Sequence, residues 1–539
     1  MKKVLLVNYA DKNAKITEPL GICYLASSLR SRGFQTDLLD SRVKGFDLDD
    51  FADHISGIMN EYFLIGISTS QDFGLSVEDS PAAVIVRNLR KNGYDGHITL
   101  GGYGPSLDWE TYMRIGPDSV NIGEGEIILC NLASALLNGE DWTKLKGMVY
   151  IDENDRVIRN PNEEIVPFDE IPAPSREILD ALAERYGKIH TNPSVQTSRG
   201  CYMQCAYCTT PLFMRNQGGP VYRTRSIKSV VDEIEELYKK GYVYFDFIDD
   251  NFLPPRKEDA LKRATELRDE MKARNIKMHF WMEFRLEYIS REILEILKEA
   301  GLRSLFIGVE SFNEQDLKLY NRRYDVQKLC NAIDQILAAG FSPDLNSEYR
   351  FRYGFINVNP LSTIATLRNT GVYFKKYNFT YKKLCKRLYM YDNNTSILQN
   401  VLKDYPEYTN DNYFKHEEVG MFYEGYSGYH EEYVKYRNRG RNYEKRLMKE
   451  IRAENNAEEY QKIVDELVAM RKDLDNDVWN VYMEGLDIAE KEDFREKLPI
   501  FFEERSRAFE QKKAQYETTL KKGTDAIGEE YGDIEKFYS

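Results

Sequence analysis

Three cysteines, Cys201, Cys205 and Cys208, lie close together in the segment Thr-Ser-Arg-Gly-Cys-Tyr-Met-Gln-Cys-Ala-Tyr-Cys, which covers residues 197–208. No fourth cysteine is near them in the sequence. Thiolates are soft ligands that suit iron–sulfur clusters, and four thiolates normally close such a cluster. Three thiolates would leave one iron with an open position, where a small molecule can bind and receive an electron.

A zinc knuckle and scattered core cysteines are the alternatives to a cluster. Structural zinc takes four ligands, in which cysteines pair with further Cys or His residues. The nearest histidine before the segment, His190, lies at no standard zinc-binding spacing. The spacing therefore favours an iron–sulfur cluster over zinc.

The spacing Cys201-x3-Cys205-x2-Cys208, with Tyr207 before the last cysteine, resembles the motif of radical S-adenosylmethionine (SAM) enzymes. The resemblance implies a [4Fe–4S] cluster on the three cysteines and SAM bound through its amino and carboxylate groups to the open iron. It also implies reductive cleavage of SAM to a 5′-deoxyadenosyl radical that takes hydrogen from a substrate. Oxygen sensitivity and an electron donor such as flavodoxin or ferredoxin belong to the same expectation.

Composition limits the class of protein. A chain of 539 residues is too long for one core, so we expect two to four domains. No apolar run is long enough to span a bilayer and the N-terminus lacks a secretory signal, so we expect no membrane association. Seven cysteines without an even framework favour reducing cytoplasm. A net charge of −14 argues against sequence-independent nucleic-acid binding.

Residues 1–145 alternate short apolar runs with helical patterns, which predicts a doubly wound, Rossmann-like parallel sheet. Ligands in such folds bind beyond the carboxyl ends of the strands, where this region has its glycine turns. The segments 18–26, 101–106 and 123–126 resemble the cobalamin-binding domain found before many radical SAM modules. The residues that this resemblance assigns to cofactor binding are Pro19, Gly21, Ser68, Thr69, Gln71, Gly101, Gly102, Ser106, Gly123, Glu124 and Gly125.

The loop 8–13 departs from one group of cobalamin domains. Domains that bind cobalt through histidine carry Asp-x-His-x-x-Gly there, and this loop has no histidine. A nucleotide-binding or empty flavodoxin-like domain is the alternative, in which the glycines serve only as tight turns.

Residues 146–190 have the proline-rich, polar pattern of a linker. Residues 191–400 then repeat strand–helix units, and the resemblance implies a partial (β/α)6 barrel with its chemistry at the strand C-termini. The predicted strands are 243–248, 278–284, 303–309 and 352–358, and the predicted helices are 227–237, 258–273, 293–298 and 326–338.

Polar residues follow three of these strands. Asp249, Asp250 and Asn251 stand where the family meets the SAM amino group, and their alternative role is a helix cap or turn. Arg285 either contacts the SAM carboxylate or pairs with Glu283. Further on, Gly-Val-Glu-Ser at 308–311 resembles a family segment beside SAM, which assigns Glu310 to the ribose hydroxyls and places Ser311 next to it.

Two features concern the rest of the barrel. Arg223 is similar to a family position, although an exposed arginine is an ordinary alternative. The segment 357–360, Asn-Val-Asn-Pro, departs from the Gly-x-Pro-Gly of relatives.

Residues 401–539 lie beyond the resemblance and form the predicted helical C-terminal domain. Tyr423, Tyr426, Tyr429, Tyr433 and Tyr436 have near-helical spacing, which favours core packing over a substrate platform. Residues 444–475 and 495–521 are predicted amphipathic helices. They form either a subdomain packed on the barrel or a lid over the substrate cavity.

The sequence therefore predicts a radical SAM enzyme, with cobalamin-dependent methyl transfer to an sp3 carbon of a small-molecule or peptide substrate as its activity. A cobalamin-free or non-methylating cyclisation, rearrangement or dehydration is one alternative. A non-catalytic corrinoid- or metal-binding module is another. The sequence identifies neither the substrate nor a residue that acts on it.

Overall fold

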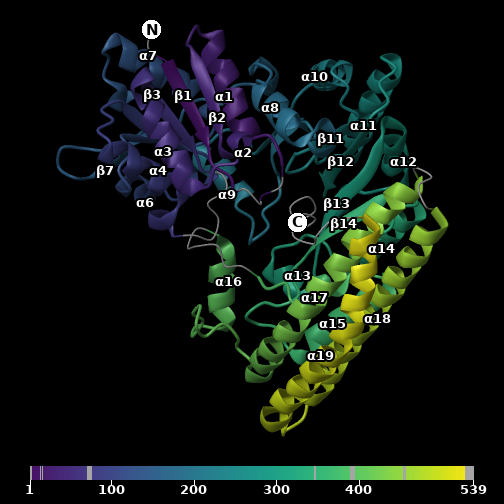
Figure 1. Cartoon of the computed structure of the whole chain (residues 1–539). Helices are drawn as coiled ribbons and strands as arrows, with labels where there is room; N and C mark the ends of the chain where they lie inside the picture. The colour runs from purple at the N-terminus through teal and green to yellow at the C-terminus, as the bar shows by residue number, and fades with distance from the viewer. Residues whose placement is uncertain are drawn as a thin grey trace. The chain divides into compact units, whose positions relative to one another are not determined.

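The computed structural model describes residues 3–11, 14, 16–69, 76–344, 347–388, 395–452 and 457–527 (Figure 1). The chain divides into two compact units, Met1–Leu305 and Phe306–Ser539. Each unit is described below by itself.

The first unit begins with a seven-stranded sheet in the order β2-β1-β3-β4-β5-β6-β7. Its strands β1 to β5 are parallel neighbours, and β6 and β7 pair antiparallel. The strand bounds are β1 Lys3–Asn8, β2 Thr36–Asp40, β3 Tyr62–Ser68, β4 His97–Gly101, β5 Ser119–Asn121, β6 Met148–Ile151 and β7 Val157–Arg159. The last two strands lie within the segment predicted as a linker, and they extend this sheet.

Helices cover both faces of the sheet because its strands are apolar on both faces. Leu5 and Val7 of β1 face a core shared with α3 (Leu48–Ile58) and α4 (Pro81–Lys91). Alternate residues of the same strand face a second core, shared with α1 (Leu20–Ser31), α7 (Gly125–Asn138) and α8 (Glu177–Tyr186). Two short helices, α5 (Tyr103–Leu107) and α6 (Trp109–Arg114), connect β4 to β5. The predicted doubly wound fold is confirmed.

The rest of the first unit carries the second set of strand–helix repeats. Strands β8 (Ser194–Val195), β11 (Tyr244–Phe247) and β12 (His279–Phe284) are parallel. Strands β9 (Ser198–Gly200) and β10 (Tyr222–Thr224) form an antiparallel pair. The helices are α9 Thr210–Gln217, α10 Ile227–Lys239, α11 Lys257–Ala273 and α12 Arg291–Ala300.

Strand β13 (Leu302–Glu310) continues the chain from the first unit into the second. The second unit then contains α13 (Glu314–Leu319), α14 (Val326–Ala338), β14 (Arg350–Phe355), α15 (Ile364–Lys376), the short helix η7 (Tyr381–Lys383) and α16 (Ser396–Asp404). The strands and helices predicted between residues 227 and 358 are each present, with ends that shift by a few residues.

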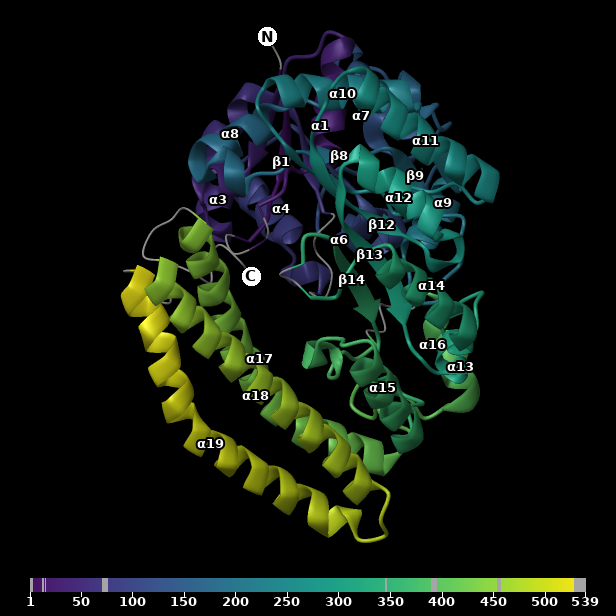
Figure 2. The same cartoon turned by 90° about the vertical axis from the view of Figure 1, so that its right-hand side faces the viewer.

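Three long helices complete the second unit: α17 (Glu417–Arg452), α18 (Ala457–Ala489) and α19 (Phe494–Ile527). They run side by side (Figure 2). The stretch predicted as helical over 444–475 is helical in all of its described residues, but these belong to two helices, α17 up to Arg452 and α18 from Ala457. The tyrosines of α17 are core residues as predicted: Tyr426, Tyr429, Tyr433 and Tyr436 are buried.

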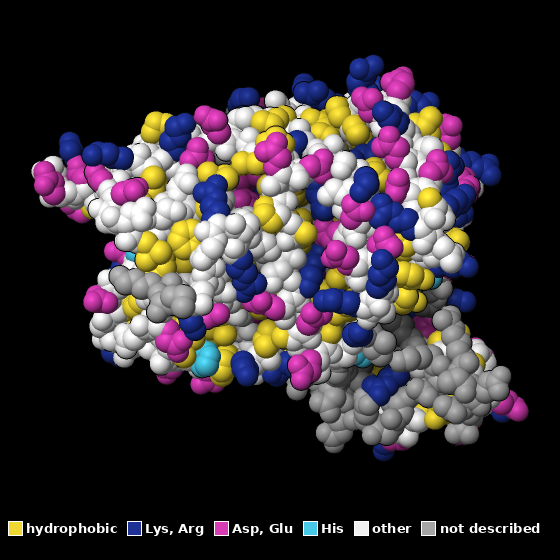
Figure 3. All heavy atoms as spheres, turned by 90° about the horizontal axis from the view of Figure 1, so that it is seen from above, with side chains coloured by type: hydrophobic (Ala, Val, Ile, Leu, Met, Phe, Trp, Pro, Cys, Tyr) yellow, Lys and Arg dark blue, Asp and Glu magenta, His cyan; other side chains and the backbone are white. Residues whose placement is uncertain are grey.

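Charged side chains of both signs are interspersed over the face shown in Figure 3, where no broad basic surface appears among the described residues. Within the described ranges, no helix combines the length and the apolar character needed to cross a membrane.

Candidate functional site

The three cysteines of the motif form one short loop directly after β9. The strand ends at Gly200, whose φ is +79°. A Cβ on this residue would lie 2.3 Å from the Val221 carbonyl oxygen, so only glycine fits the β9–β10 pair at this point. Cys201 and Cys205 are buried with Met203, and Tyr207 and Cys208 pack against this group. A backbone bond from Cys208 N to Cys205 O, 3.2 Å long, closes the turn.

The thiol environment is mostly apolar with one cation beside it. Burial raises the pKa of Cys201 and raises the pKa of Cys208 to about 12. The Arg285 guanidinium approaches the sulfur of Cys205 at 3.5 Å and bonds Glu287 at 2.6 Å. In the described part of the chain, no three His, Cys, Asp or Glu side chains are grouped closely enough to hold a metal ion as they stand. None of the seven cysteines forms a disulfide bond in the described structure.

Asp249 holds the segment that leads into the cysteine loop. Its carboxylate is 1% exposed and accepts the backbone N–H groups of Thr197 and Ser198 and both of their hydroxyls. These bonds fix the start of β9, three residues before Cys201. The geometry assigns Asp249 to positioning this segment, and its contact with SAM stays a prediction.

Asp250 and Asn251 differ from Asp249 and from each other. Asp250 keeps solvent-accessible surface, but burial of its carboxyl raises the pKa, and the carboxylate accepts a 3.0 Å bond from the Thr210 hydroxyl at the start of α9. The Asn251 side chain is fully buried; its amide nitrogen bonds the Leu253 carbonyl at 2.7 Å, and its oxygen has no hydrogen-bond partner among the described residues. Of these two neighbours, only Asp250 has solvent-accessible surface.

Glu310 and Ser311 lie in the second unit, at the end of β13. Glu310 has a φ of +61°, which is uncommon for a residue other than glycine and marks a backbone held by its surroundings. A Cβ at Gly308 would lie 2.3 Å from a Glu310 carboxylate oxygen, so that glycine makes room for the side chain. The Ser311 hydroxyl bonds Asp316 at 2.8 Å.

The predicted glycine turns of the N-terminal sheet fall at the carboxyl ends of β4 and β5 and at the start of α1, and Ser68 and Thr69 lie at the carboxyl end of β3. Positions Gly21 and Gly101 are open: a Cβ at Gly21 meets nothing within 4 Å, and one at Gly101 meets only Asn121, at 3.8 Å. The Asn121 side-chain oxygen is buried without a partner among the described residues. Pro19 precedes α1, and Thr69 donates to the Gly101 carbonyl after Ser68 ends β3. Gln71 lies outside the described residues.

The turns at 102–106 and 123–125 are instead packed against α9. A Cβ at Gly123 would lie 2.5 Å from the Gln217 side chain. The rings of Tyr103 and Phe213 stack with centroids 4.3 Å apart. The Ser106 hydroxyl accepts the N–H of Gly123 at 2.9 Å, and the Ser106 carbonyl accepts the Asn216 amide at 3.2 Å. These turns therefore join the sheet to the helix that follows the cysteine loop.

Charged side chains extend the same junction. Arg199, two residues before Cys201, bonds Glu124 and Glu126 at 2.7 Å each, and Arg223 also pairs with Glu124. Arg199 further lies over the rings of Phe168 and Tyr24, at 4.5 and 5.0 Å. Burial raises the pKa of Glu124, but the two guanidinium charges outweigh burial and leave the pKa below its usual value.

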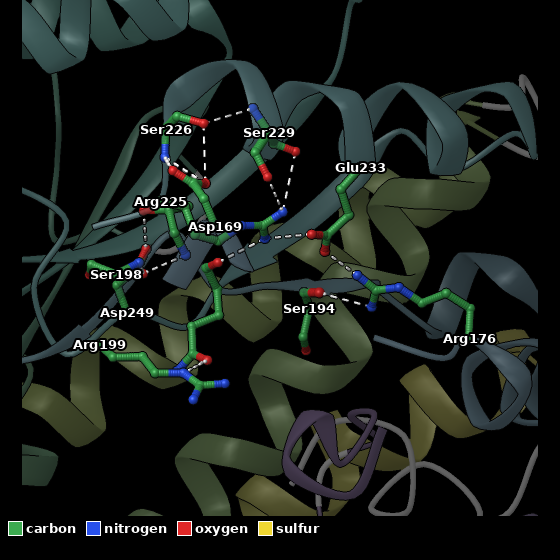
Figure 4. Close-up of polar contacts among 12 residues, drawn as sticks. Asp169, Arg176, Ser194, Ser198, Arg199, Arg225, Ser226, Ser229, Glu233 and Asp249 are labelled. Carbon is green, nitrogen blue, oxygen red and sulfur yellow. Dashed lines mark hydrogen bonds and ion pairs between the residues drawn. The ribbon is translucent and has the colours of Figure 1, made fainter. Parts of the chain in front are cut away.

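A second group of ion pairs lies beside the first (Figure 4). Arg176, just before α8, bonds Glu18 at 2.5 Å and pairs with Glu233 of α10. Glu233 also pairs with Arg225 at 2.5 Å, and Asp169 accepts the N–H and hydroxyl of Ser226 at the start of α10. Burial is the first influence on the pKa of Glu18 and raises it. Three carboxylates of the N-terminal domain thus form ion pairs with arginines that precede and follow the cysteine loop. The carboxylates are Glu18, Glu124 and Glu126, and the arginines are Arg176, Arg199 and Arg223.

This network was not predicted from the sequence, where Arg223 stood alone and Glu124 was assigned to cofactor binding. Charged residues are ordinarily exposed, and each of these residues is unremarkable in sequence. Arg199, directly before Gly200, is the residue from which a buried ion pair could have been predicted. A charged residue between two buried strand positions requires a buried partner of opposite charge.

Two family models match the chain. Residues 195–360 match the radical SAM superfamily, and residues 9–133 match the B12 binding domain. The chain combines a radical SAM module with a B12-binding domain. The Cys201–Cys208 loop lies within the radical SAM match, and the glycine turns lie within the B12-binding match.

Curated relatives match the chain over part of their length. An uncharacterized methyltransferase of Pyrococcus horikoshii is 27% identical over 58% of this chain and 65% of the relative. The anaerobic magnesium-protoporphyrin IX monomethyl ester cyclase of Rubrivivax gelatinosus is 24% identical over 69% of this chain and 65% of the relative. The hopanoid C-2 methylase of Rhodopseudomonas palustris is 25% identical over 59% of this chain and 53% of the relative. The chain spans less than two thirds of each of these relatives.

Solved structures share the fold. The cobalamin-dependent SAM radical enzyme OxsB, with aqua-cobalamin and SAM bound, has a TM-score of 0.71 at 18% identity, covering 100% of this chain and 85% of that chain. The radical SAM methyltransferase TsrM of Kitasatospora setae, with cobalamin and a [4Fe-4S] cluster bound, has a TM-score of 0.56 at 19% identity, covering 70% of this chain and 71% of that chain.

Proposed function

We propose that the protein is a radical SAM enzyme that transfers a methyl group, with the help of cobalamin, to an sp3 carbon of a small-molecule or peptide substrate. The observation that carries this proposal is the direct junction, within one unit, between the cysteine loop of the radical SAM module and the strand ends of the B12-binding domain. Two relatives whose names are methyltransferase and methylase support it. An electron donor such as flavodoxin or ferredoxin, and a reducing cytoplasmic location, belong to the same proposal.

The residues fit the cofactors by donor chemistry and space. Cys201, Cys205 and Cys208 are three soft donors gathered on one loop, which suits a [4Fe–4S] cluster with one open iron. The open glycines Gly21 and Gly101 provide space for a corrinoid, and Asn121, which lies next to Gly101 and has an unpartnered oxygen, provides a polar contact. When bound, the cluster supplies the electron that cleaves SAM, and cobalamin supplies a carrier for the methyl group.

The protein's own residues position and shield these groups. The carboxylate of Asp250 suits the SAM ammonium, and Arg285, held by Glu287, suits the SAM carboxylate. Glu310 and Ser311 are proposed for the ribose. Because Glu124 is engaged by two arginines, we propose that it positions the cysteine loop instead of contacting the corrinoid.

Three measurements test the proposal. Anaerobically prepared protein should contain about one [4Fe–4S] cluster per chain by iron and sulfide analysis, as three thiolates bind one cluster. Addition of hydroxocobalamin should change its visible spectrum. With SAM and dithionite the protein should release 5′-deoxyadenosine, whereas Cys205→Ala should release none and Cys385→Ala, outside the motif, should behave as the parent. Zinc in place of iron would overturn the proposal.

Cyclisation without methyl transfer is a second candidate, favoured by the match to the Rubrivivax cyclase. The two activities differ in the fate of SAM. Methyl transfer leaves S-adenosylhomocysteine, whereas a radical cyclisation leaves only 5′-deoxyadenosine and methionine. Formation of S-adenosylhomocysteine in the presence of cobalamin therefore decides between them.

A further inference from the structure

Positive side chains gather in the second unit where β14, η7 and α17 meet. Arg437 and Arg441 are four residues apart and so share one face of α17. Between them in sequence, Asn438 accepts a 2.9 Å hydrogen bond from the ammonium of Lys382 on η7. This bond places Lys382 beside both arginines.

Strand β14 approaches the same place. The N–H of Thr380, just before η7, donates to the Tyr353 hydroxyl of β14 at 2.8 Å. The backbone of Lys386 accepts the N–H groups of Asn357 and Val358, which follow β14, at 2.9 and 3.0 Å. The η7 turn, with Lys382, Lys383 and Lys386, is therefore fixed between β14 and α17.

The cluster has few carboxylates to balance it. Arg437 bonds Asp475 at 2.7 Å, and Arg471 bonds Glu444. Among the residues that the structure describes, no carboxylate forms an ion pair with Lys382, Lys383 or Arg441. A buried Arg437 nitrogen and a buried Arg441 nitrogen have no hydrogen-bond partner in the same described part. Lys382 and Arg441 are thus half-buried cations beside Arg437, and neither has an ion-pair partner in this part of the structure. Lys383 lies beside Lys382, and the nearest carboxylates that act on Lys383 and Arg441 are Glu310 and Glu444.

Burial and repulsion between the cations lower the pKa of two members of the cluster, Lys382 and Arg441. Burial, and then the charges of Arg437, Arg441, Lys383 and Lys386, lower the pKa of Lys382 to about 8. Burial, and then Arg437, Arg471 and Arg350, lower the pKa of Arg441 to about 10. Grouped cations at this density destabilise the folded protein unless an anion binds among them.

We propose that this basic cluster, formed by Lys382, Lys383, Arg437 and Arg441, is a binding site for the phosphate group of a small phosphorylated ligand. A phosphate carries two charges and several acceptor oxygens, which matches several converging lysine and arginine donors better than a single carboxylate does. The site lies wholly within the second unit, so the proposal does not depend on methyl transfer.

The test uses the full-length protein without SAM, at constant ionic strength, with inorganic pyrophosphate as the probe. Pyrophosphate should raise the melting temperature, and acetate at the same ionic strength should not. Arg441→Gln should weaken pyrophosphate binding about 10- to 100-fold, because it removes one charge-assisted contact. The same variant should melt higher than the parent in the absence of pyrophosphate, because repulsion is relieved.

Two controls keep the result decisive. Lys462→Gln removes a positive charge from the exposed face of α18, where it pairs with Glu458, and should leave pyrophosphate binding unchanged. Hydrogen exchange of the unmodified protein should show pyrophosphate-dependent protection in residues 380–387 and 435–442, which requires no variant to fold. Equal stabilisation by acetate, protection elsewhere only, or parent-like binding by Arg441→Gln would each overturn the proposal. Adenosine monophosphate and glycerol 3-phosphate then separate a nucleotide from another phosphate ester.

Discussion

Replacement of Arg199 by methionine should break the junction between the B12-binding domain and the cysteine loop. The side chain is about nine-tenths buried. Within the described ranges it is the one cation paired with the buried Glu126 carboxylate, whereas Glu124 retains Arg223. Removal of one partner from a buried ion pair costs ~3–5 kcal/mol, because the other charge remains buried and uncompensated. We therefore expect Arg199→Met to lower the free energy of unfolding of the first unit by about that amount.

A second substitution isolates the cause. Glu126→Gln removes the carboxylate charge that Arg199→Met leaves without a cation. The loss of unfolding free energy in the double variant Arg199→Met/Glu126→Gln should therefore be about 1–3 kcal/mol smaller than the sum of the losses in the two single variants. Arg156→Met is the matched control: Arg156 pairs with Asp152 on the surface, its side chain is 68% exposed, and its loss should cost less than ~1 kcal/mol.

Urea unfolding followed by tryptophan fluorescence measures these energies. Of the four tryptophans, Trp479 alone belongs to the second unit, so a Trp479→Phe background restricts the signal to the first unit. If the two single substitutions add to within ~0.5 kcal/mol of the double variant, Arg199 and Glu126 are not coupled and the reasoning fails.

Three further predictions follow from other positions. Gly200→Ala should lower the iron content of reconstituted protein and its melting temperature, because its Cβ would lie 2.3 Å from the Val221 carbonyl; iron analysis and calorimetry check this, and parent-like values would contradict it. Lys382→Gln should be more stable than the parent at pH 7 by about 1–3 kcal/mol. This difference in unfolding free energy should shrink as pH rises through about 8, because the folded parent then loses the lysine proton. A constant difference from pH 7 to 10 would contradict the prediction. Gly425→Ala should destabilise the three-helix region by a few kcal/mol, roughly the cost of overpacking, because its Cβ would lie 2.1 Å from Phe502; urea unfolding measures it, with exposed Gly428→Ala as the control.

Local patterns predicted the barrel elements well because each element signals itself. Helix α10, for example, begins at the capping residue Ser226 and presents Val230, Ile234 and Leu237 on one buried face. The strands that precede the polar residues at 249–251 and 285 are present where the sequence predicts them. Arg285, after the second of these strands, lies beside Cys205.

The long helices were harder to delimit. The stretch from 444 to 475 has helical patterning throughout, and no proline or glycine within it marks a break. The end of α17 at Arg452 and the start of α18 at Ala457 are set by antiparallel packing, in which Leu447 and Leu467 are both buried. Tertiary contacts of this kind leave no local signal.

Ion pairs between distant segments were not predictable for a related reason. Arg176 and Glu18 are 158 residues apart, and Arg199 and Glu124 are 75 apart. A single sequence shows that a charge exists but not which buried partner neutralises it. The network became evident only when the sheet, the segment after it and β9 were placed together.

The glycine turns show how one motif can serve two purposes. Gly21 and Gly101 leave open space, as close approach by a flat ligand requires, whereas Gly123 leaves room for the Gln217 side chain of α9. The neighbouring Glu124 then reaches Arg199, two residues before the first cysteine. Part of a motif typical of ligand binding thus positions the cysteine loop. An alanine at Gly123 is therefore expected to disturb the loop, and one at Gly21 to disturb only ligand binding.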